Sequence, residues 1–129
     1  MFELEINGKV YGFKFGMGFM RKLNATMKQP VDGLKNVEEN IGLRYKLASI
    51  MEGELEALEE VLLAANDKQE PRVTRDILDS YIEDEETDVD DLFDKVLDFL
   101  RNANVTKSAM KKLDEAAAEQ KAKRAAENA

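Results

Sequence analysis

The chain has 129 residues, which is enough for one domain with a modest hydrophobic core. It contains neither cysteine nor histidine, and this excludes disulfides, thiolate nucleophiles, histidine-ligated metals and histidine general bases. Its net charge of −8 arises mainly in residues 52–99, where eighteen acidic side chains outnumber four basic ones, so the protein is not expected to bind nucleic acid phosphates.

A β-hairpin is predicted at residues 2–15. Apolar and acidic residues alternate over residues 2–6, which is the pattern of a half-buried strand. The Asn7-Gly8 pair that follows tolerates the positive φ angles of a two-residue type I′ turn, and residues 10–15 have the composition of a returning strand. Since an isolated hairpin is only marginally stable in water, its apolar face requires a helix to cover it.

Amphipathic helices are predicted along the rest of the domain, because apolar residues recur at intervals of three and four. Their predicted ranges are residues 17–27, 33–51, 54–65, 74–83 and 88–102. Thr74 and Thr87 are the expected N-caps of the last two helices. Gly42 falls inside the second helix, where a bend or a close packing contact would explain it.

These elements predict an α+β fold that is predominantly helical. An N-terminal β-hairpin packs on four to five amphipathic helices in a single globular domain of residues 1–104. Residues 105–129 have a different character, because Met110 and Leu113 are their only large apolar side chains beyond the first residue. A charged, solvated tail or linker that is helical or disordered is predicted there, since packing rather than propensity stabilises most helices.

No catalytic or metal-binding arrangement is found in the sequence. The acidic residues 84–90 have a spacing similar to that of an EF-hand loop, but the sixth position is Val89 instead of glycine and the twelfth is Lys95 instead of glutamate. No lysine followed by serine or threonine accompanies the glycines near residue 16, which excludes a phosphate-binding loop. We therefore expect no enzyme activity, no metal and no cofactor.

Binding to other proteins is the class of function that remains. No apolar run approaches the ~20 residues that cross a bilayer, and acidic residues near the start replace the basic ones of an export signal, so a cytoplasmic protein is expected. Flexible apolar side chains suit adaptable binding surfaces, with packing in the core as the alternative interpretation. The candidate partner-binding residues are Met17, Met20, Met51, Met110 and Leu113.

Several segments, taken in order, resemble a known family. They are INGKVYGFKFGMGFMRKLN at residues 6–24, PRVT at residues 71–74, Tyr81-Ile82, and LFDKVLDFLRNAN at residues 92–104 followed by Thr106-Lys107. Over residues 2–107 the chain resembles the tail assembly chaperones of long-tailed, siphovirus-type phages and prophages of Gram-positive bacteria. None of these segments is a catalytic motif, so the resemblance depends on the collinear set.

The resemblance implies a non-structural viral protein that acts in tail morphogenesis. Such chaperones bind and solubilise the tape measure protein in the cytoplasm of the infected or lysogenic host, and they are absent from the mature virion. They help to recruit the tail tube protein, in many phages through the C-terminal extension of a longer form made by ribosomal frameshifting. Binding at many places along one client also implies self-association.

Two other functions remain compatible with the residues themselves. The acidic residues 52–99 would suit a small inhibitor or DNA mimic that binds a basic protein, and salt would then weaken binding strongly. A structural subunit of the tail or of the head–tail connector is the other alternative. Purified virions would contain such a subunit, whereas they would lack a chaperone.

Overall fold

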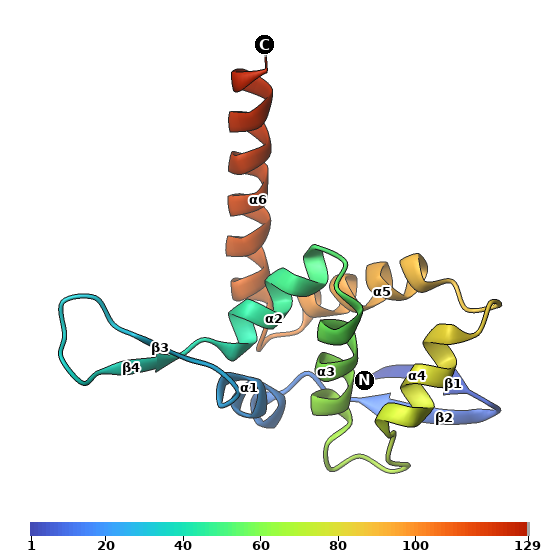
Figure 1. Ribbon diagram of the computed structural model, residues 1–129. Coiled ribbons are helices and arrows are strands. Elements are labelled where there is room, and N and C mark those ends of the chain that lie inside the picture. Colours follow the sequence, from blue (N-terminus) through green and yellow to red (C-terminus); the bar gives the residue numbers. More distant parts are fainter. Residues whose placement is uncertain (129) are drawn as a thin grey trace.

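The computed structural model describes residues 1–128 and has two small hairpins and six helices (Figure 1). This confirms the predicted α+β, predominantly helical fold. In chain order the elements are β1 (Phe2–Ile6), β2 (Lys9–Phe13), α1 (Met17–Asn24), β3 (Lys28–Pro30), β4 (Glu38–Asn40), α2 (Gly42–Met51), α3 (Leu55–Asn66), α4 (Arg75–Glu83), α5 (Val89–Asn102) and α6 (Lys107–Glu127).

The N-terminal hairpin has the predicted turn. Strands β1 and β2 pair antiparallel with Phe2 opposite Phe13, and the turn residues Asn7 and Gly8 have φ angles of 53° and 78°. Two consecutive positive φ angles are what a type I′ turn requires. Alternate residues of β1 are buried, which confirms that one face of the hairpin is covered by the rest of the domain.

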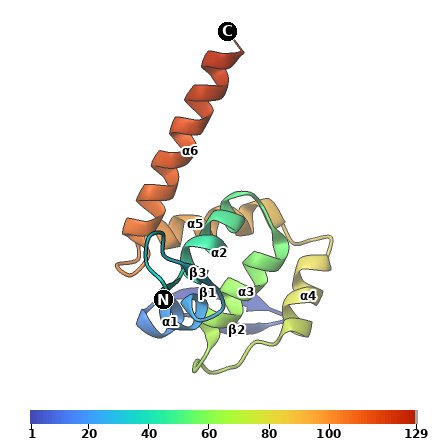
Figure 2. The same cartoon turned by 60° about the vertical axis from the view of Figure 1, so that its left-hand side comes forward.

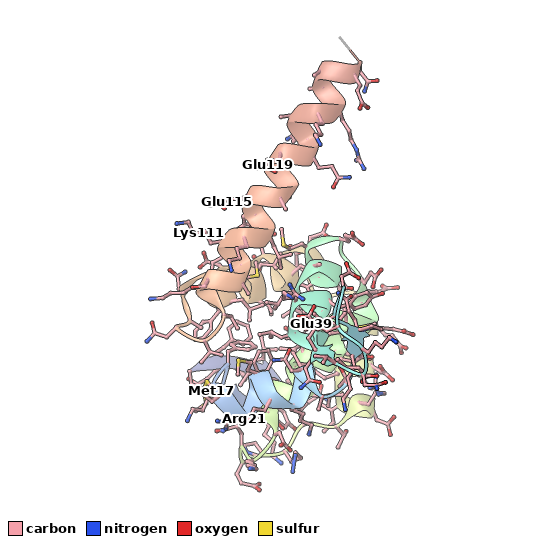
Figure 3. The ribbon with its side chains drawn as sticks, turned by 90° about the vertical axis from the view of Figure 1, so that its left-hand side faces the viewer. Met17, Arg21, Glu39, Lys111, Glu115 and Glu119 are labelled. Carbon is pink, nitrogen blue, oxygen red and sulfur yellow. The ribbon has the colours of Figure 1, made fainter. Side chains whose placement is uncertain are left out.

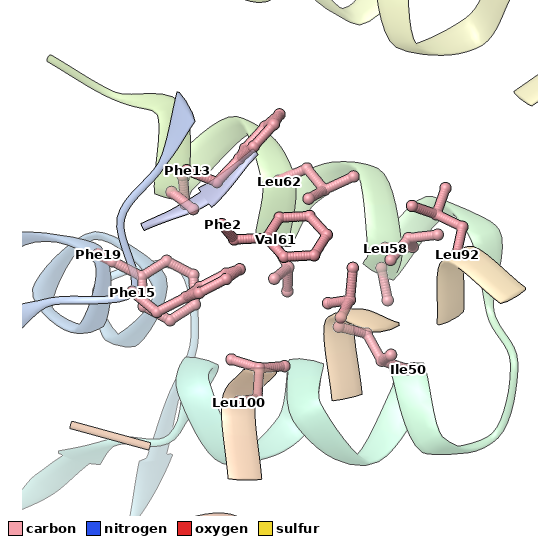
Figure 4. Close-up of a cluster of buried hydrophobic side chains, with 14 of the residues drawn as sticks. Phe2, Phe13, Phe15, Phe19, Ile50, Leu58, Val61, Leu62, Leu92 and Leu100 are labelled. Atoms are coloured by element: carbon pink, nitrogen blue, oxygen red, sulfur yellow. The ribbon is translucent and has the colours of Figure 1, made fainter. Parts of the chain in front are cut away.

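The core lies between the hairpin and helices α1, α2, α3 and α5 (Figure 4). Aromatic rings from the hairpin, from the connection after it and from α1 and α5 meet one another, with 5.1 Å between the ring centroids of Phe15 and Phe19 and 5.5 Å between those of Phe2 and Phe99. Aliphatic side chains from the helices close around them. The labelled ones are Ile50 from α2, Leu58, Val61 and Leu62 from α3, and Leu92 and Leu100 from α5.

The prediction of a helix over residues 33–51 is wrong for the first half of that range. Residues 28–40 instead form an arm, in which β3 and β4 pair antiparallel and extend away from the body (Figure 1). Gly33 and Asn36 both have positive φ angles, 81° and 60°, which no helix accommodates. The preceding helix also ends earlier than predicted, at Asn24 rather than residue 27.

Gly42 is the first residue of helix α2, and a close contact between two backbones requires glycine at this position. A Cβ atom at this position would lie 1.7 Å from the carbonyl oxygen of Leu23 in α1, so a larger residue does not fit. The backbone N–H of Leu43 donates to Oδ1 of Asn24 at 3.0 Å, and this hydrogen bond joins the same two helices. The predicted packing contact is therefore confirmed, although the glycine is at the start of the helix and not in its interior.

The N-cap predicted for α4 is confirmed, and the one predicted for α5 is off by one residue. Thr74 Oγ1 accepts a hydrogen bond from the backbone N–H of Ile77 at 3.2 Å. The cap of α5 is Asp88, whose Oδ1 accepts from the backbone N–H of Asp91 at 3.0 Å, and not Thr87. A carboxylate at this position also stabilises the positive end of the helix dipole.

Helix α6 is fixed at its base and projects from the body (Figure 2). Met110 is fully buried, and the hydroxyl of Thr106 donates to the carbonyl of Leu100 at 2.6 Å. Arg101 of α5 binds both carboxylate oxygens of Asp114, at 2.9 and 3.0 Å. From residue 115 to residue 128 every side chain is exposed, so the base of the predicted tail packs on the domain and the rest does not.

Candidate protein-binding groove

Two hollows adjoin on the surface between α1 and α3, and we call them together the α1–α3 groove. Their volumes are about 540 and 560 Å³, and Ala64 of α3 lines both. The first is lined by Lys22, Leu23, Thr26, Met27, Lys46, Glu60, Leu63, Ala64 and Arg75. The second is lined by Lys14, Gly16, Met17, Gly18, Phe19, Ala64, Asp67, Lys68 and Gln69.

The first hollow has an apolar floor and a charged rim. Leu23 is buried in the floor, and Met27 and Leu63 are half-buried beside it. On the rim, the ammonium group of Lys46 in α2 forms an ion pair with Glu60 in α3. The side chain of Lys46 is mostly covered, so this pair holds two helices together as well as charging the rim.

The second hollow lies where the chain leaves β2 and enters α1. The backbone N–H of Lys14 donates to the carbonyl of Ala65 at 2.8 Å, which attaches this connection to α3. On the side of the hollow that follows α3, Asp67 forms ion pairs with Lys22 of α1 at 3.2 Å and with Arg72 at 3.0 Å. These two ion pairs hold that side of the hollow in place. Met17 borders the hollow and is 48% exposed.

Charge distinguishes the groove from the rest of the molecule. Its lining carries five cations and two carboxylates, a net charge of +3, whereas the whole chain carries −8. Both carboxylates are engaged by neighbouring cations, as described above. The groove therefore combines apolar side chains with a net positive charge, which suits a protein segment of opposite charge.

A comparison with protein families decides what kind of protein carries this groove. A family model described as "Phage tail assembly chaperone protein, TAC" matches residues 3–115. The chain belongs to this chaperone family. Neither the curated proteins nor the solved structures contain a match to the chain. The matched region includes the hairpin, the arm, the groove and the base of α6, so the resemblance seen in the sequence is confirmed for the family.

The described part of the chaperone has neither a metal-holding cluster nor a membrane-spanning helix. Within residues 1–128 no group of three or more acidic side chains is arranged to hold a metal ion. No helix among the described residues is long and apolar enough to cross a membrane. The tail assembly chaperones are not an enzyme family.

The structure does not bring the five predicted partner-binding residues of the chaperone together. Met17 lies on the exposed side of α1, one helical turn from Arg21 (Figure 3). Three others are half-buried against the core, namely Met20, Met51 and Leu113. Met110 is fully buried at the base of α6. Only Met17 is thus both well exposed and part of the groove.

Sequence reasoning missed the cations of the groove, because they come from separate parts of the chaperone. Lys14 precedes α1, Lys22 lies in α1, Lys46 belongs to α2, Lys68 follows α3 and Arg75 begins α4. One signal was present, since residues 1–28 contain five basic and two acidic side chains. The other cations lie in stretches whose composition is acidic or balanced, so only the fold reveals that they converge.

Glu59 lies next to the groove and connects α3 to α4. Its buried carboxylate accepts a hydrogen bond from Nη1 of Arg75 at 3.3 Å. The pKa of Glu59 is raised to about 7, mainly by burial and also by the neighbouring carboxylate of Asp79, while the positive charge of Arg75 opposes both effects. The position of Arg75 on the groove rim therefore depends on a carboxylate that titrates near neutral pH.

Proposed function

We propose that this chaperone binds and solubilises the tape measure protein while the phage tail assembles. The single observation that carries the proposal is the family match over residues 3–115. A net charge of −8 supports it, because charge of one sign keeps a protein soluble while it shields apolar segments of another. The chaperone then acts in the cytoplasm of the infected or lysogenic bacterium and is absent from the mature virion.

The α1–α3 groove is the proposed contact surface. An amphipathic client helix would lay its apolar face on Leu63 and Met27 at one end and on Met17 at the other, in the helix-in-groove mode. Among the five residues predicted from the sequence, Met17 is the proposed direct contact. The remaining four are proposed to support the surface from the core, which agrees with their burial.

Recruitment of the tail tube protein is proposed to use a C-terminal extension. Residues 115–127 are helical and exposed and have no apolar stripe, which suits a spacer that holds a following segment away from the body. An A-rich run encoding Lys111-Lys112 would permit the frameshift that produces such a longer form. Sequencing the gene tests this directly, because the absence of an A-rich heptamer and of an overlapping reading frame excludes it.

Several copies are proposed to coat one tape measure protein, with contacts between neighbouring copies. A long helical client offers many similar apolar stripes, and each copy covers only the few turns that its groove can hold. Self-association along the client would make coating cooperative. The number of copies per client, measured by light scattering on the purified complex, is expected to rise with client length.

The experiment that tests the function is co-expression with the neighbouring long helical open reading frame, followed by pull-down and a solubility assay. The large partner is expected to be soluble only in the presence of this chaperone. A partner that stays insoluble while the chaperone remains alone contradicts the proposal. Mass spectrometry of purified virions is expected to find no copy of this chain, and its presence there would favour a structural tail or connector subunit.

The groove is tested by the substitution Met17→Glu, with Leu55→Glu as its matched control. Both residues begin a helix and both are about half exposed, at 48% and 44%, but only Met17 borders the groove. A glutamate in the first turn is favourable in either helix, so neither variant should unfold. Met17→Glu is expected to lower the recovery of soluble client by about tenfold and Leu55→Glu to leave it unchanged. Equal recovery with both variants would exclude Met17 from the contact.

A further inference from the structure

The charge of the α1–α3 groove specifies what kind of segment it receives. We infer that its ligand is an acidic amphipathic helix, with an apolar stripe flanked by glutamate or aspartate side chains. This inference rests on the proposed function and names the chemistry of the client segment. It follows from three properties of the groove: its length, the placement of its cations and the charge of the surfaces around it.

The length of the groove fits about three turns of helix. Its two hollows follow α1 from Gly16 to Met27, and α1 itself has eight residues and is thus ~12 Å long. A client helix laid alongside would therefore need about ten to twelve residues to contact both hollows. Within that length, residues at i, i+3 or i+4 and i+7 reach the two apolar ends at Met17 and Leu63.

Cations are present at both ends of the groove, where they can flank such a stripe. Lys14 and Lys68 line the hollow that Met17 borders, and Lys22, Lys46 and Arg75 line the other. Lys22, Lys46 and Arg75 form ion pairs with Asp67, Glu60 and Glu59, whereas Lys14 and Lys68 form none among the described residues, so these two lysines carry the positive charge that is not yet matched. Acidic side chains on a docked helix would supply the missing negative charge along both edges.

The surfaces outside the groove favour the same choice. With +3 of the charge placed in the groove, the rest of the chain carries −11. A basic segment would bind the acidic surface of residues 52–99 at many places without a defined geometry, whereas an acidic one is repelled there and attracted to the groove. Charge therefore contributes specificity here, and the apolar floor of the groove contributes affinity.

Two synthetic helical peptides of about fourteen residues test the inference. Both carry leucine at i, i+3, i+4, i+7, i+8 and i+11, and the other positions are mainly glutamate in one and lysine in the other. Fluorescence anisotropy with the full chain is expected to show that the glutamate peptide binds about tenfold more tightly. The preference is expected to shrink as salt rises from ~0.05 M to ~0.5 M, because counterions screen exposed charges.

A pair of charge-reversal variants locates the effect. K14E/K68E reverses two exposed lysines of the groove, and K121E/K123E makes the same change of charge on the exposed part of α6. The first variant is expected to lose the preference for glutamate, and the second to retain it. Equal binding of both peptides to the natural chain overturns the inference, and so does an equal effect of the two variants.

Failure of the inference and failure of the proposed function give different results. If K14E/K68E leaves the full-length tape measure protein soluble and bound, and the peptides are not discriminated, then the function stands and the acidic ligand is excluded. If the glutamate peptide binds as expected but no tape measure protein is solubilised, the charge selectivity of the groove stands and the function is excluded.

Discussion

Replacing Gly42 by alanine tests the closest approach between two elements of the fold. The added Cβ would lie 1.7 Å from the carbonyl oxygen of Leu23 and 2.7 Å from its carbonyl carbon. Both are backbone atoms, so no rotation of a side chain can relieve the clash. To restore an ordinary separation of at least 3.4 Å, helices α1 and α2 must move apart by about 1.7 Å.

The expected magnitude follows from what that movement disrupts. The overpacking itself costs about 1–3 kcal/mol. The hydrogen bond from Leu43 N–H to Asn24 Oδ1 is lost or lengthened, which adds about 1 kcal/mol, and alanine returns less than about 1 kcal/mol through its higher helix propensity. We expect a loss of about 1–4 kcal/mol in the free energy of unfolding, and a fall in Tm of roughly 4–14 °C.

Thermal and urea denaturation followed by circular dichroism measure this effect. Gly18→Ala is the control, because Gly18 lies inside α1 and a Cβ there would meet no atom within 4 Å. The control is expected to keep or raise Tm, since alanine favours a helix more than glycine does. If Gly42→Ala melts within about 2 °C of the natural chain, α1 and α2 do not make the contact described and the reasoning is refuted.

Two further predictions concern buried polar side chains of α3. The side chain of Asn66 is fully buried, and its amide group donates to the carbonyls of Gly12 at 2.9 Å and Pro71 at 3.2 Å. Its Oδ1 accepts a hydrogen bond from the N–H of Val73 at 2.7 Å. Asn66→Ala is expected to lower the free energy of unfolding, measured in urea, by about 3 kcal/mol or more. A milder loss would mean that water replaces these bonds. For Glu59 the pKa is raised from 4.5 to about 7 on folding, so its contribution to stability is complete below pH 4.5 and declines as the pH rises to about 7. The Tm difference between the natural chain and Glu59→Gln is therefore expected to shift against the natural chain between these pH values, and a pH-independent difference would contradict the raised pKa.

The parts of the fold that follow from neighbouring residues were predictable from the sequence. Asn7-Gly8 specifies its turn by backbone chemistry alone, and the apolar spacing of α3 and α5 specifies their buried faces. The arm was not predictable in this way. Leu34 and Val37 continue the helical spacing of α2, yet both are exposed, because turn residues between and before them direct the chain into a hairpin.

The candidate site was less predictable than the fold, because it depends on contacts between distant residues. Asn66 appears in the sequence as an ordinary polar residue at the end of a helix, but its hydrogen bonds attach the hairpin to the α3–α4 connection. That attachment helps to place β2 beside α3, and so brings Lys14 to the same groove as Lys68. Composition gave only the excess of basic residues near the N-terminus.

The arm of residues 28–40 buries almost no side chain, so the stability of the domain depends little on the sequence of the arm. Twelve of its thirteen residues are exposed and Val31 is the exception, so the arm can open locally without loss of any core contact. Substitutions in the arm are therefore expected to change the free energy of global unfolding very little. Substitutions in this segment are therefore expected to cost related chaperones little stability. The arm is the part of the surface where binding to a new client can evolve with the smallest effect on folding.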